Sequence, residues 1–131
     1  MSSSSGPLAP RPKSVLLIDD EPDILHVWAM VFEMEGLTVS TAANGREGLA
    51  RARELRPDVI ICDFMMPDLN GVEVCRQIRK DRTLKGIAVI LWSAARGIDA
   101  EDWADMVVEK PVRIEAFIAD VKLLASKRAE L

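Results

Sequence analysis

The sequence predicts an α/β protein built on one doubly wound parallel sheet. From Ser14 onward, short apolar runs alternate with amphipathic stretches, which is the pattern of repeated strand–helix units. The chain has 131 residues, of which 49% are hydrophobic and 29% charged, so it suits a single globular domain with its own core. We expect five strands and five helices in strict alternation, joined by right-handed crossovers.

The first strand–helix unit has clear boundaries. Residues 14–18 form an apolar run that predicts the first strand. Pro22 suits the first turn of a helix over residues 22–35, because the N–H that proline lacks has no helical partner there. Gly36 ends this helix, and residues 37–41 predict a short second strand.

The middle of the chain contains a strand that is apolar at all but its first position. Asn44 and Gly45 form a turn signal before a helix over residues 46–55, and an Arg-Pro pair breaks that helix. Residues 58–62 predict the third strand, which is apolar after its first residue, as is typical of a central parallel strand. A helix over residues 72–80 follows.

The last part of the chain has one weak element. Residues 87–92 predict the fourth strand, and residues 106–109 predict the fifth. Between them, residues 99–104 offer only a short helix candidate, so we expect a stunted fourth helix. Apolar residues recur at helical spacing over residues 113–127, which predicts the final helix.

Composition limits the location and the partners of the protein. Residues 1–13 are rich in Ser and Pro and predict a flexible tail or linker ahead of the domain at residues 14–131. The net charge of −4 and the scattered cationic residues argue against contact with nucleic acid. There is no apolar run of membrane-spanning length and no secretory signal pattern. Cys62 and Cys75 lie in apolar contexts and predict buried free thiols of a reducing compartment, so we expect a cytoplasmic protein without a membrane partner.

Charged and hydroxyl side chains stand where four of the predicted strands end. They are Asp19 and Asp20 after the first strand, Asp63 after the third, Ser93 after the fourth and Lys110 after the fifth. In a doubly wound fold these strand ends open on one edge of the sheet, where such folds bind ligands. Clustered carboxylates need a proton or a cation, and an all-oxygen ligand set suits Mg²⁺. The two adjacent aspartates could also serve only as acidic residues at a helix start.

This set of side chains predicts phosphoryl chemistry. An aspartate beside a divalent ion and a lysine can attack phosphorus, and the product is an aspartyl phosphate. The lysine and the metal ion would neutralise charge on the transferring group, and a hydroxyl such as that of Ser93 would donate to one of its oxygens. Asp63 is the candidate nucleophile.

The chain resembles the receiver domain of two-component response regulators, of the chemotaxis-regulator type. The resemblance rests on four motifs in order, and it covers residues 14–125. The motifs are Leu17-Ile18-Asp19-Asp20-Glu21-Pro22, Asp63-Phe64-Met65-Met66-Pro67 with Gly71, Ser93-Ala94, and Lys110-Pro111. The resemblance implies a flavodoxin-like (βα)5 fold with strand order 2-1-3-4-5, here with a shortened fourth helix.

The resemblance also implies a role for each motif residue. Asp63 matches the phosphoacceptor, Asp20 the direct Mg²⁺ ligand, and Asp19 the carboxylate that acts through a bound water. The backbone carbonyl of Met65 matches the third protein ligand of the metal. Ser93 matches the switch hydroxyl.

Lys110 matches the phosphate-binding lysine, and its bond to Pro111 is expected to be cis. Three departures from the family pattern bear on how the site works. Val107 replaces the usual aromatic residue three positions before the lysine, and the stretch from Ser93 to Lys110 is short by about a helical turn. Met65 and Ala95 are apolar where the family steers the hydrolytic water, which predicts slow self-dephosphorylation.

The resemblance implies a phosphorylation-dependent signalling module of a two-component or phosphorelay system. Asp63 would accept a phosphoryl group from a histidine kinase or a histidine phosphotransfer protein and so change the affinity for an unknown downstream protein. The protein would be a stand-alone regulator or the excised receiver of a hybrid kinase, a monomer or weak dimer, and no enzyme beyond Mg²⁺-dependent self-phosphorylation and slow dephosphorylation.

Two alternatives remain open. One is a receiver-like binding module that is not phosphorylated. The other is a Mg²⁺-dependent phosphohydrolase with an aspartate nucleophile, although Met65 stands where haloacid-dehalogenase-like enzymes carry a second Asp.

Overall fold

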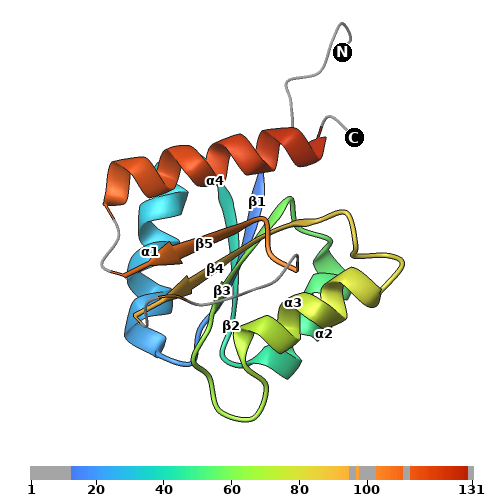
Figure 1. Cartoon of the computed structure of the whole chain (residues 1–131). Helices are drawn as coiled ribbons and strands as arrows, with labels where there is room; N and C mark the ends of the chain where they lie inside the picture. Colours follow the sequence, from blue (N-terminus) through green and yellow to red (C-terminus); the bar gives the residue numbers. More distant parts are fainter. Residues whose placement is uncertain (1–12, 95–96, 98–102, 111–112, 130–131) are drawn as a thin grey trace, which may run out of the picture.

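A computed structural model describes residues 13–94, 97, 103–110 and 113–129 of the chain (Figure 1). Three expectations fall outside this part: the flexible head over residues 1–12, the helix over residues 99–102 and the isomer of the Lys110–Pro111 bond. The described residues form one sheet and four helices.

The sheet has five parallel strands in the order β2-β1-β3-β4-β5, which confirms the predicted fold class. Each strand lies within one residue of its expected position. The strands are β1 (Ser14–Ile18), β2 (Thr38–Ala42), β3 (Val59–Asp63), β4 (Ala88–Ser93) and β5 (Met106–Glu109). The one-residue shifts of β3 and β4 change two site residues. Asp63 and Ser93 are the last residues of these strands, whereas the sequence predicted that they follow them.

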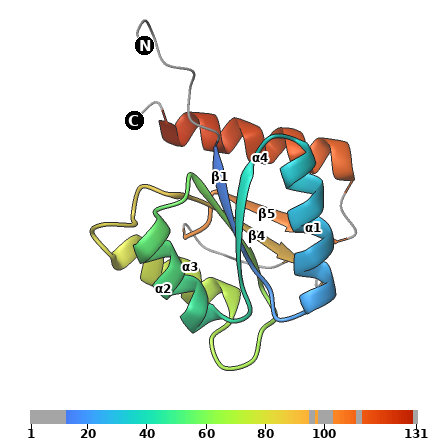
Figure 2. The same ribbon diagram turned by 180° about the vertical axis from the view of Figure 1, so that it is seen from behind.

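The four helices cover the sheet on both faces. They are α1 (Pro22–Met34), α2 (Gly45–Leu55), α3 (Gly71–Lys80) and α4 (Ile114–Ala129), the last being the helix expected as the fifth. Figures 1 and 2 show α1 and α4 against one face and α2 and α3 against the other. Trp103 and Ala104, which were expected at the end of the short fourth helix, are not helical.

Local signals in the sequence explain where the helices begin. Pro22 is the first residue of α1. The side chain of Asn44 accepts a hydrogen bond from the N–H of Glu47 at 2.8 Å, and that of Asn70 accepts one from the N–H of Glu73 at 3.0 Å. Each asparagine therefore caps a helix by satisfying an N–H that has no partner within the helix.

Two apolar clusters, one on each face of the sheet, form the core. Leu16, Ile60 and Leu91 contribute to the cluster beneath α2 and α3, while Leu17, Ile61 and Trp92 contribute to the cluster beneath α1 and α4. This alternation follows from the two-residue period of a strand. Every residue of β3 is buried, as the sequence predicted for a central strand.

Both cysteines, Cys62 and Cys75, are buried free thiols, as predicted. None of the described helices is long and apolar enough to cross a membrane.

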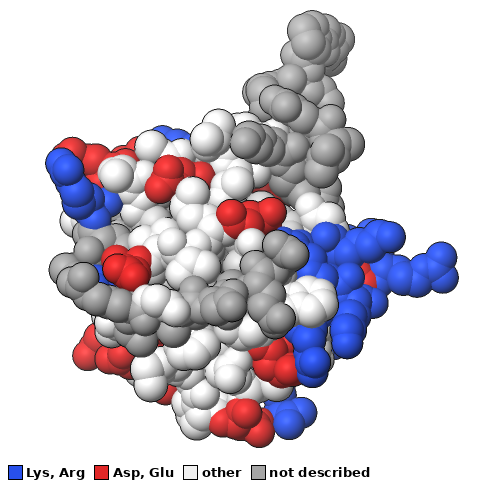
Figure 3. All heavy atoms as spheres, viewed as in Figure 1, with Lys and Arg blue, Asp and Glu red and all other residues white. Residues whose placement is uncertain are grey.

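Basic side chains from two helices and the turn after α3 form a cluster on one side of the surface. Figure 3 shows a concentration of Lys and Arg on the side of the molecule where α3 ends. Lys80, Arg82 and Lys85 are exposed there. Arg53 of α2 joins them through an ion pair of 2.9 Å with Asp81. The crossover from α3 leads to the start of β4, so this basic surface lies at the opposite end of the sheet from the carboxyl ends of the strands.

Candidate functional site

The carboxyl ends of four strands bring the predicted site residues together. Asp63 ends β3, where its Cα pairs with that of Trp92 on β4. Ser93 ends β4 and pairs with Glu109, the residue before Lys110. Ile18, the last residue of β1, pairs with Cys62, so that Asp19 and Asp20 emerge beside Asp63.

Three carboxylates form a compact cluster. One oxygen from each of Asp19, Asp20 and Asp63 lies within 4.8 Å of the other two. Asp19 is fully buried and Asp63 is 5% exposed, whereas Asp20 is exposed. Asp19 and Asp63 therefore form the floor of the site, and Asp20 forms its solvent side.

Asp19 has an unused acceptor that suits a cation. Its Oδ1 accepts a hydrogen bond from the N–H of Glu21 at 2.9 Å, but its buried Oδ2 has no hydrogen-bond partner among the described residues. A buried carboxylate oxygen without such a partner is costly. Together with the neighbouring carboxylates it makes an all-oxygen set of the kind that hard divalent ions bind, so the residues present fit Mg²⁺.

Lys110 supplies the only positive charge that the structure pairs with this cluster, within the described residues. Its Nζ lies 3.3 Å from Oδ1 of Asp63 and 3.6 Å from Oδ2 of Asp19. Even so, the pKa of Asp63 is raised to about 6, mainly because of burial and then because of the negative charge of Asp19. Burial also raises the pKa of Asp19. The charge of Lys110 therefore does not fully offset the burial and the mutual repulsion of these carboxylates.

Backbone hydrogen bonds hold the ends of the strands in place. The N–H of Phe64 donates to the carbonyl of Trp92 at 2.9 Å, and the N–H of Lys110 donates to the carbonyl of Ser93 at 2.7 Å. The N–H of Gly71, the first residue of α3, donates to the carbonyl of Phe64 at 2.9 Å. These bonds continue the sheet by one residue and fix the loop that follows Asp63.

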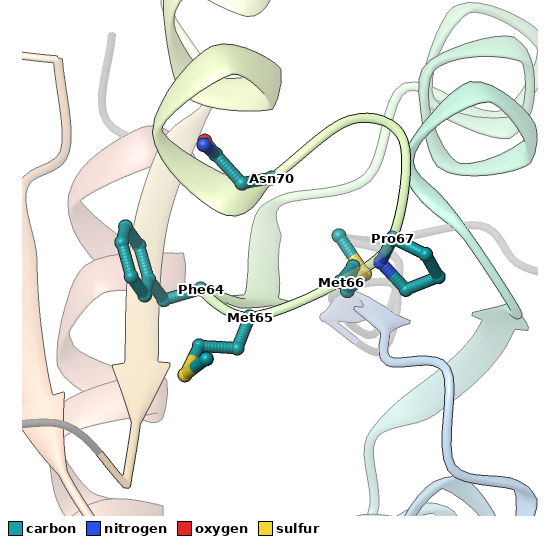
Figure 4. Close-up of a pocket in the computed structure, with 5 residues that line it drawn as sticks. All are labelled: Phe64, Met65, Met66, Pro67 and Asn70. Atoms are coloured by element: carbon teal, nitrogen blue, oxygen red, sulfur yellow. The ribbon is translucent and has the colours of Figure 1, made fainter.

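The loop between β3 and α3 forms one wall of the site. Met65, whose carbonyl is the predicted third metal ligand, has a side chain that is 62% exposed. A pocket of about 420 Å³ opens beside this loop, as Figure 4 shows. Its lining residues are Phe64, Met65, Met66, Pro67 and Asn70. The side chain of Asp68 points to Arg46, with 2.7 Å between Oδ2 and Nε, and is not part of the carboxylate cluster, as expected for a loop residue.

Ser93 is fully buried at the end of β4. Val107, at the position where an aromatic residue was missing, is 37% exposed on β5. Ala95, the second residue predicted to leave the hydrolytic water unsteered, lies outside the described residues.

Trp92 is a residue of the site that the motifs did not predict. The Lys110 Nζ lies 4.7 Å from the centre of its ring, so the ammonium group contacts both the carboxylates and an aromatic face. A tryptophan directly before the predicted hydroxyl was a visible signal in the sequence. The contact of Trp92 with Lys110 could not be predicted, because it depends on the face of β4 on which the tryptophan side chain lies.

Comparison with known proteins identifies the family. The sequence matches the response regulator receiver domain over residues 15–122. The chain therefore belongs to the response regulator receiver family, as the motifs indicated. Receiver domains bind Mg²⁺ at their acidic pocket, and the cluster of Asp19, Asp20 and Asp63 is consistent with such a pocket.

Individual relatives agree with this assignment. The chain is 31% identical over 113 residues to the DNA-binding response regulator MtrA of Mycolicibacterium smegmatis, a match that covers 82% of this chain and 48% of MtrA. The chain thus spans about half the length of this curated relative. The chemotaxis protein CheY4 of Vibrio cholerae has a similar structure, with 27% identity, a TM-score of 0.80, and coverage of 87% of this chain and 99% of CheY4. The response regulator TrrA of Thermotoga maritima, solved in complex with Mg²⁺-BeF, is 33% identical with a TM-score of 0.78 and coverage of 86% and 98%.

Proposed function

We propose that this domain is a phosphorylation-dependent signalling module in which Asp63 accepts a phosphoryl group from a histidine kinase or a histidine phosphotransfer protein. The observation that carries the proposal is the position of the Asp63 carboxylate. It lies at the end of the central strand, 5% exposed, within 4.8 Å of two further carboxylates and 3.3 Å from the Lys110 ammonium. A carboxylate between a lysine and a cation site is arranged as a nucleophile toward phosphorus.

The transfer step requires one bond to form and one to break. An Asp63 carboxylate oxygen attacks phosphorus as the P–N bond of the donor phosphohistidine breaks, and the imidazole leaves with the electron pair and takes up a proton. Lys110 stays beside Asp63 and offsets the charge of the phosphoryl oxygens. The Ser93 hydroxyl donates to one of those oxygens and acts as the switch.

Four groups of this chain would hold Mg²⁺: the carboxylates of Asp20 and Asp63, the carboxylate of Asp19 through a water, and the carbonyl of Met65. The ion supplies positive charge to the phosphoryl oxygens. The Oδ2 of Asp19 has no hydrogen-bond partner among the described residues, and the pKa of Asp63 is raised. Both observations support a site that needs this charge.

Phosphorylation would change the affinity of the domain for a downstream protein, with the domain at residues 14–131 acting as a monomer or weak dimer in the cytoplasm. The protein would be a stand-alone regulator or the receiver of a hybrid kinase. Its own chemistry would be limited to self-phosphorylation and slow loss of the phosphoryl group. The structure of the similar protein TrrA in complex with Mg²⁺-BeF supports the proposal that this domain binds Mg²⁺ together with a phosphoryl group.

The test is to treat the protein with a small phosphodonor and Mg²⁺ and to measure its intact mass. We expect a gain of one phosphoryl group that requires Mg²⁺ and is lost in Asp63→Asn. Asp68→Asn is the matched control, because Asp68 lies five residues away in the same loop but pairs with Arg46 outside the cluster. Equal labelling of wild type and Asp63→Asn would refute the assignment of Asp63. No labelling of the wild type, together with no binding of Mg²⁺-beryllofluoride, would favour the non-phosphorylated binding module.

A further inference from the structure

Trp92 lies where the phosphoryl site meets the core beneath α1 and α4. It pairs with Asp63 across the β3–β4 ladder, and 1% of its surface is exposed. Its ring faces the Lys110 Nζ at 4.7 Å. Its indole N–H has no hydrogen-bond partner among the described residues. Within the part of the chain that the structure describes, packing and the lysine therefore orient this ring, and no hydrogen bond does.

Lys110 makes three contacts of two kinds within the described residues. Two are ionic, with Asp63 at 3.3 Å and Asp19 at 3.6 Å, and the third is with the ring of Trp92. A lysine side chain has four rotatable bonds, so ion pairs to one end leave its stem able to take several paths. The ring gives the ammonium group a preferred side from which to approach the carboxylates. A large aromatic face is the surface best suited to this contact.

The same ring is packed against both helices on that face of the sheet. Its centre lies 5.5 Å from that of Trp28 in α1 and 5.5 Å from that of Phe117 in α4, on which it is stacked with an interplanar angle of 16°. Trp28 and Phe117 also contact each other, at 5.3 Å. Because protein cores are close-packed, a rotation of one ring in this group displaces the others. The aromatic cluster thus connects β4 to α1 and α4.

We propose that Trp92 is the positioning residue for Lys110 and that the Lys110–Trp92 contact couples the state of Asp63 to α1 and α4. The proposal rests on the proposed function, in which Asp63 takes the phosphoryl group. The oxygens of an added phosphoryl group lie farther from the Asp63 backbone than the carboxylate oxygens do. The Lys110 ammonium moves outward to contact them, and its position over the Trp92 ring therefore changes. Val107 offers no aromatic ring on β5 that could report the state of the site. Among the described residues, Trp92 is the buried aromatic side chain that contacts the lysine.

The first test uses the resting protein and needs no phosphorylation. Protons that lie over an indole face are shifted upfield by its ring current, so the side-chain Hε resonance of Lys110, assigned with Lys110→Arg, should be upfield of those of the other lysines. We expect this shift to disappear in Trp92→Leu, to persist in part in Trp92→Phe, and to be unchanged in Phe32→Leu. Phe32 is a matched control because it is fully buried in the same cluster and contacts Trp28 and Phe117. A Lys110 resonance without an upfield shift in the wild type would overturn the proposal even if Trp92→Leu does not fold.

The second test measures Mg²⁺-beryllofluoride binding in the same variants. We expect Trp92→Leu to weaken binding about three- to tenfold, as loss of a partly desolvated cation–π contact predicts, with partial rescue by Trp92→Phe. In the wild type, binding should also shift the side-chain resonances of Trp28 and Phe117. Phe32→Leu should leave the affinity within about twofold, since it removes core packing but no contact with Lys110.

Two further results separate the proposal from a purely structural role of Trp92. Equal losses of affinity in Trp92→Leu and Phe32→Leu would mean that only the core is damaged, and the proposal would then be wrong. Unchanged resonances of Trp28 and Phe117 on binding would exclude the coupling. A wild type that does not bind Mg²⁺-beryllofluoride would refute the proposed function, while the Lys110 ring-current shift would still decide whether Trp92 positions the lysine.

Discussion

Gly71 packs so closely on the end of β3 that it has no room for a side chain. A Cβ at this position would lie 2.5 Å from the carbonyl oxygen of Asp63 and 2.9 Å from the Cα of Phe64. Both of these atoms belong to the backbone that carries the proposed phosphoacceptor. The start of α3 and the end of β3 are therefore in direct contact, and the glycine permits that contact.

Gly71→Ala should destabilise the protein by about 2 kcal/mol, because backbone atoms have to move to admit the methyl group. A loss of stability would be informative, because replacing glycine with alanine in a helix otherwise stabilises a protein by about 1 kcal/mol. Urea unfolding measures the stability, and Mg²⁺-beryllofluoride binding should weaken as well, since Asp63 is displaced.

Gly86→Ala is the matched control for this substitution. A Cβ there would have nothing within 4 Å, so stability should change by no more than about 0.5 kcal/mol. Equal effects of the two substitutions would show that the Gly71 contact is not what limits stability.

Asp63 makes the stability of the metal-free protein depend on pH. Its pKa is raised to about 6 from 3.8, mainly by burial and then by Asp19. Between these two pH values the folded protein binds more protons than the unfolded chain, so this residue's contribution to stability is fully present below pH 3.8 and is lost as the pH rises toward 6. In Asp63→Asn the side chain has nearly the shape of the protonated carboxyl group and is uncharged at every pH. The variant should therefore be more stable than the wild type at pH 7.5, by about 3 kcal/mol, and equal to it near pH 3.5.

Thermal or urea unfolding of the two proteins at both pH values, without divalent ions, tests this expectation. Mg²⁺ should make the wild type the more stable of the two proteins at pH 7.5. The ion binds the ionised Asp63 carboxylate and so stabilises the wild type, whereas Asp63→Asn lacks this ligand. A difference between the proteins that is the same at both pH values would show that ionisation of Asp63 is not the cause.

The principal site residues could be predicted because each stands where an apolar run ends. Asp63 follows the apolar run over residues 59–62. A parallel sheet places the carboxyl ends of its strands on one edge, so the order of the elements was enough to predict that Asp19, Asp20 and Lys110 converge there. The compact carboxylate cluster and the Lys110 ion pairs agree with that reasoning.

Properties that depend on side-chain direction and on packing between distant segments could not be predicted. Trp92 reads as an ordinary apolar residue of β4 until the register shows it beside Asp63 and under Lys110. The basic residues at the end of α3 are close together in the sequence, but only the packing of α2 on α3 brings Arg53 to them.

Met65 should keep the phosphorylated state long-lived. Its side chain is 62% exposed two residues after Asp63, and an apolar group cannot orient an attacking water. Met65→Asn introduces a donor and an acceptor at this point and should speed the loss of the phosphoryl group about three- to tenfold, the effect of one added hydrogen bond.

The rate is measured as the decay of the phosphorylated mass after the phosphodonor is removed. Met65→Leu is the matched control and should decay as slowly as the wild type, since it exchanges one apolar side chain for another. If Met65→Asn decays no faster than Met65→Leu, the side chain at this position does not control hydrolysis.

Arg79 of α3 joins two segments that lead into the last strands of the sheet. Its guanidinium group donates to backbone carbonyls on both sides, and it forms a 2.7 Å ion pair with Asp105 just before β5. The carbonyls belong to Trp103 at 2.8 Å, Lys85 at 3.0 Å and Ile87 at 2.6 Å. Asp105 in turn accepts a hydrogen bond from the N–H of Val89 in β4 at 2.7 Å.

Arg79→Met should therefore destabilise the protein by about 3 kcal/mol in urea unfolding, because it leaves several carbonyls and one carboxylate without their charged donor. Arg79→Lys should recover only part of this loss, since an ammonium group cannot reach all four acceptors in the fixed geometry of a guanidinium. Arg53→Met is the comparison on the neighbouring helix: its ion pair with Asp81 is half exposed and should contribute less than about 1 kcal/mol. A loss for Arg79→Met no larger than that for Arg53→Met would mean that the structure before β5 does not depend on Arg79. The larger loss that we expect would instead make this side chain, at the end of the sheet opposite to Asp63, a main support of the strand that carries Lys110.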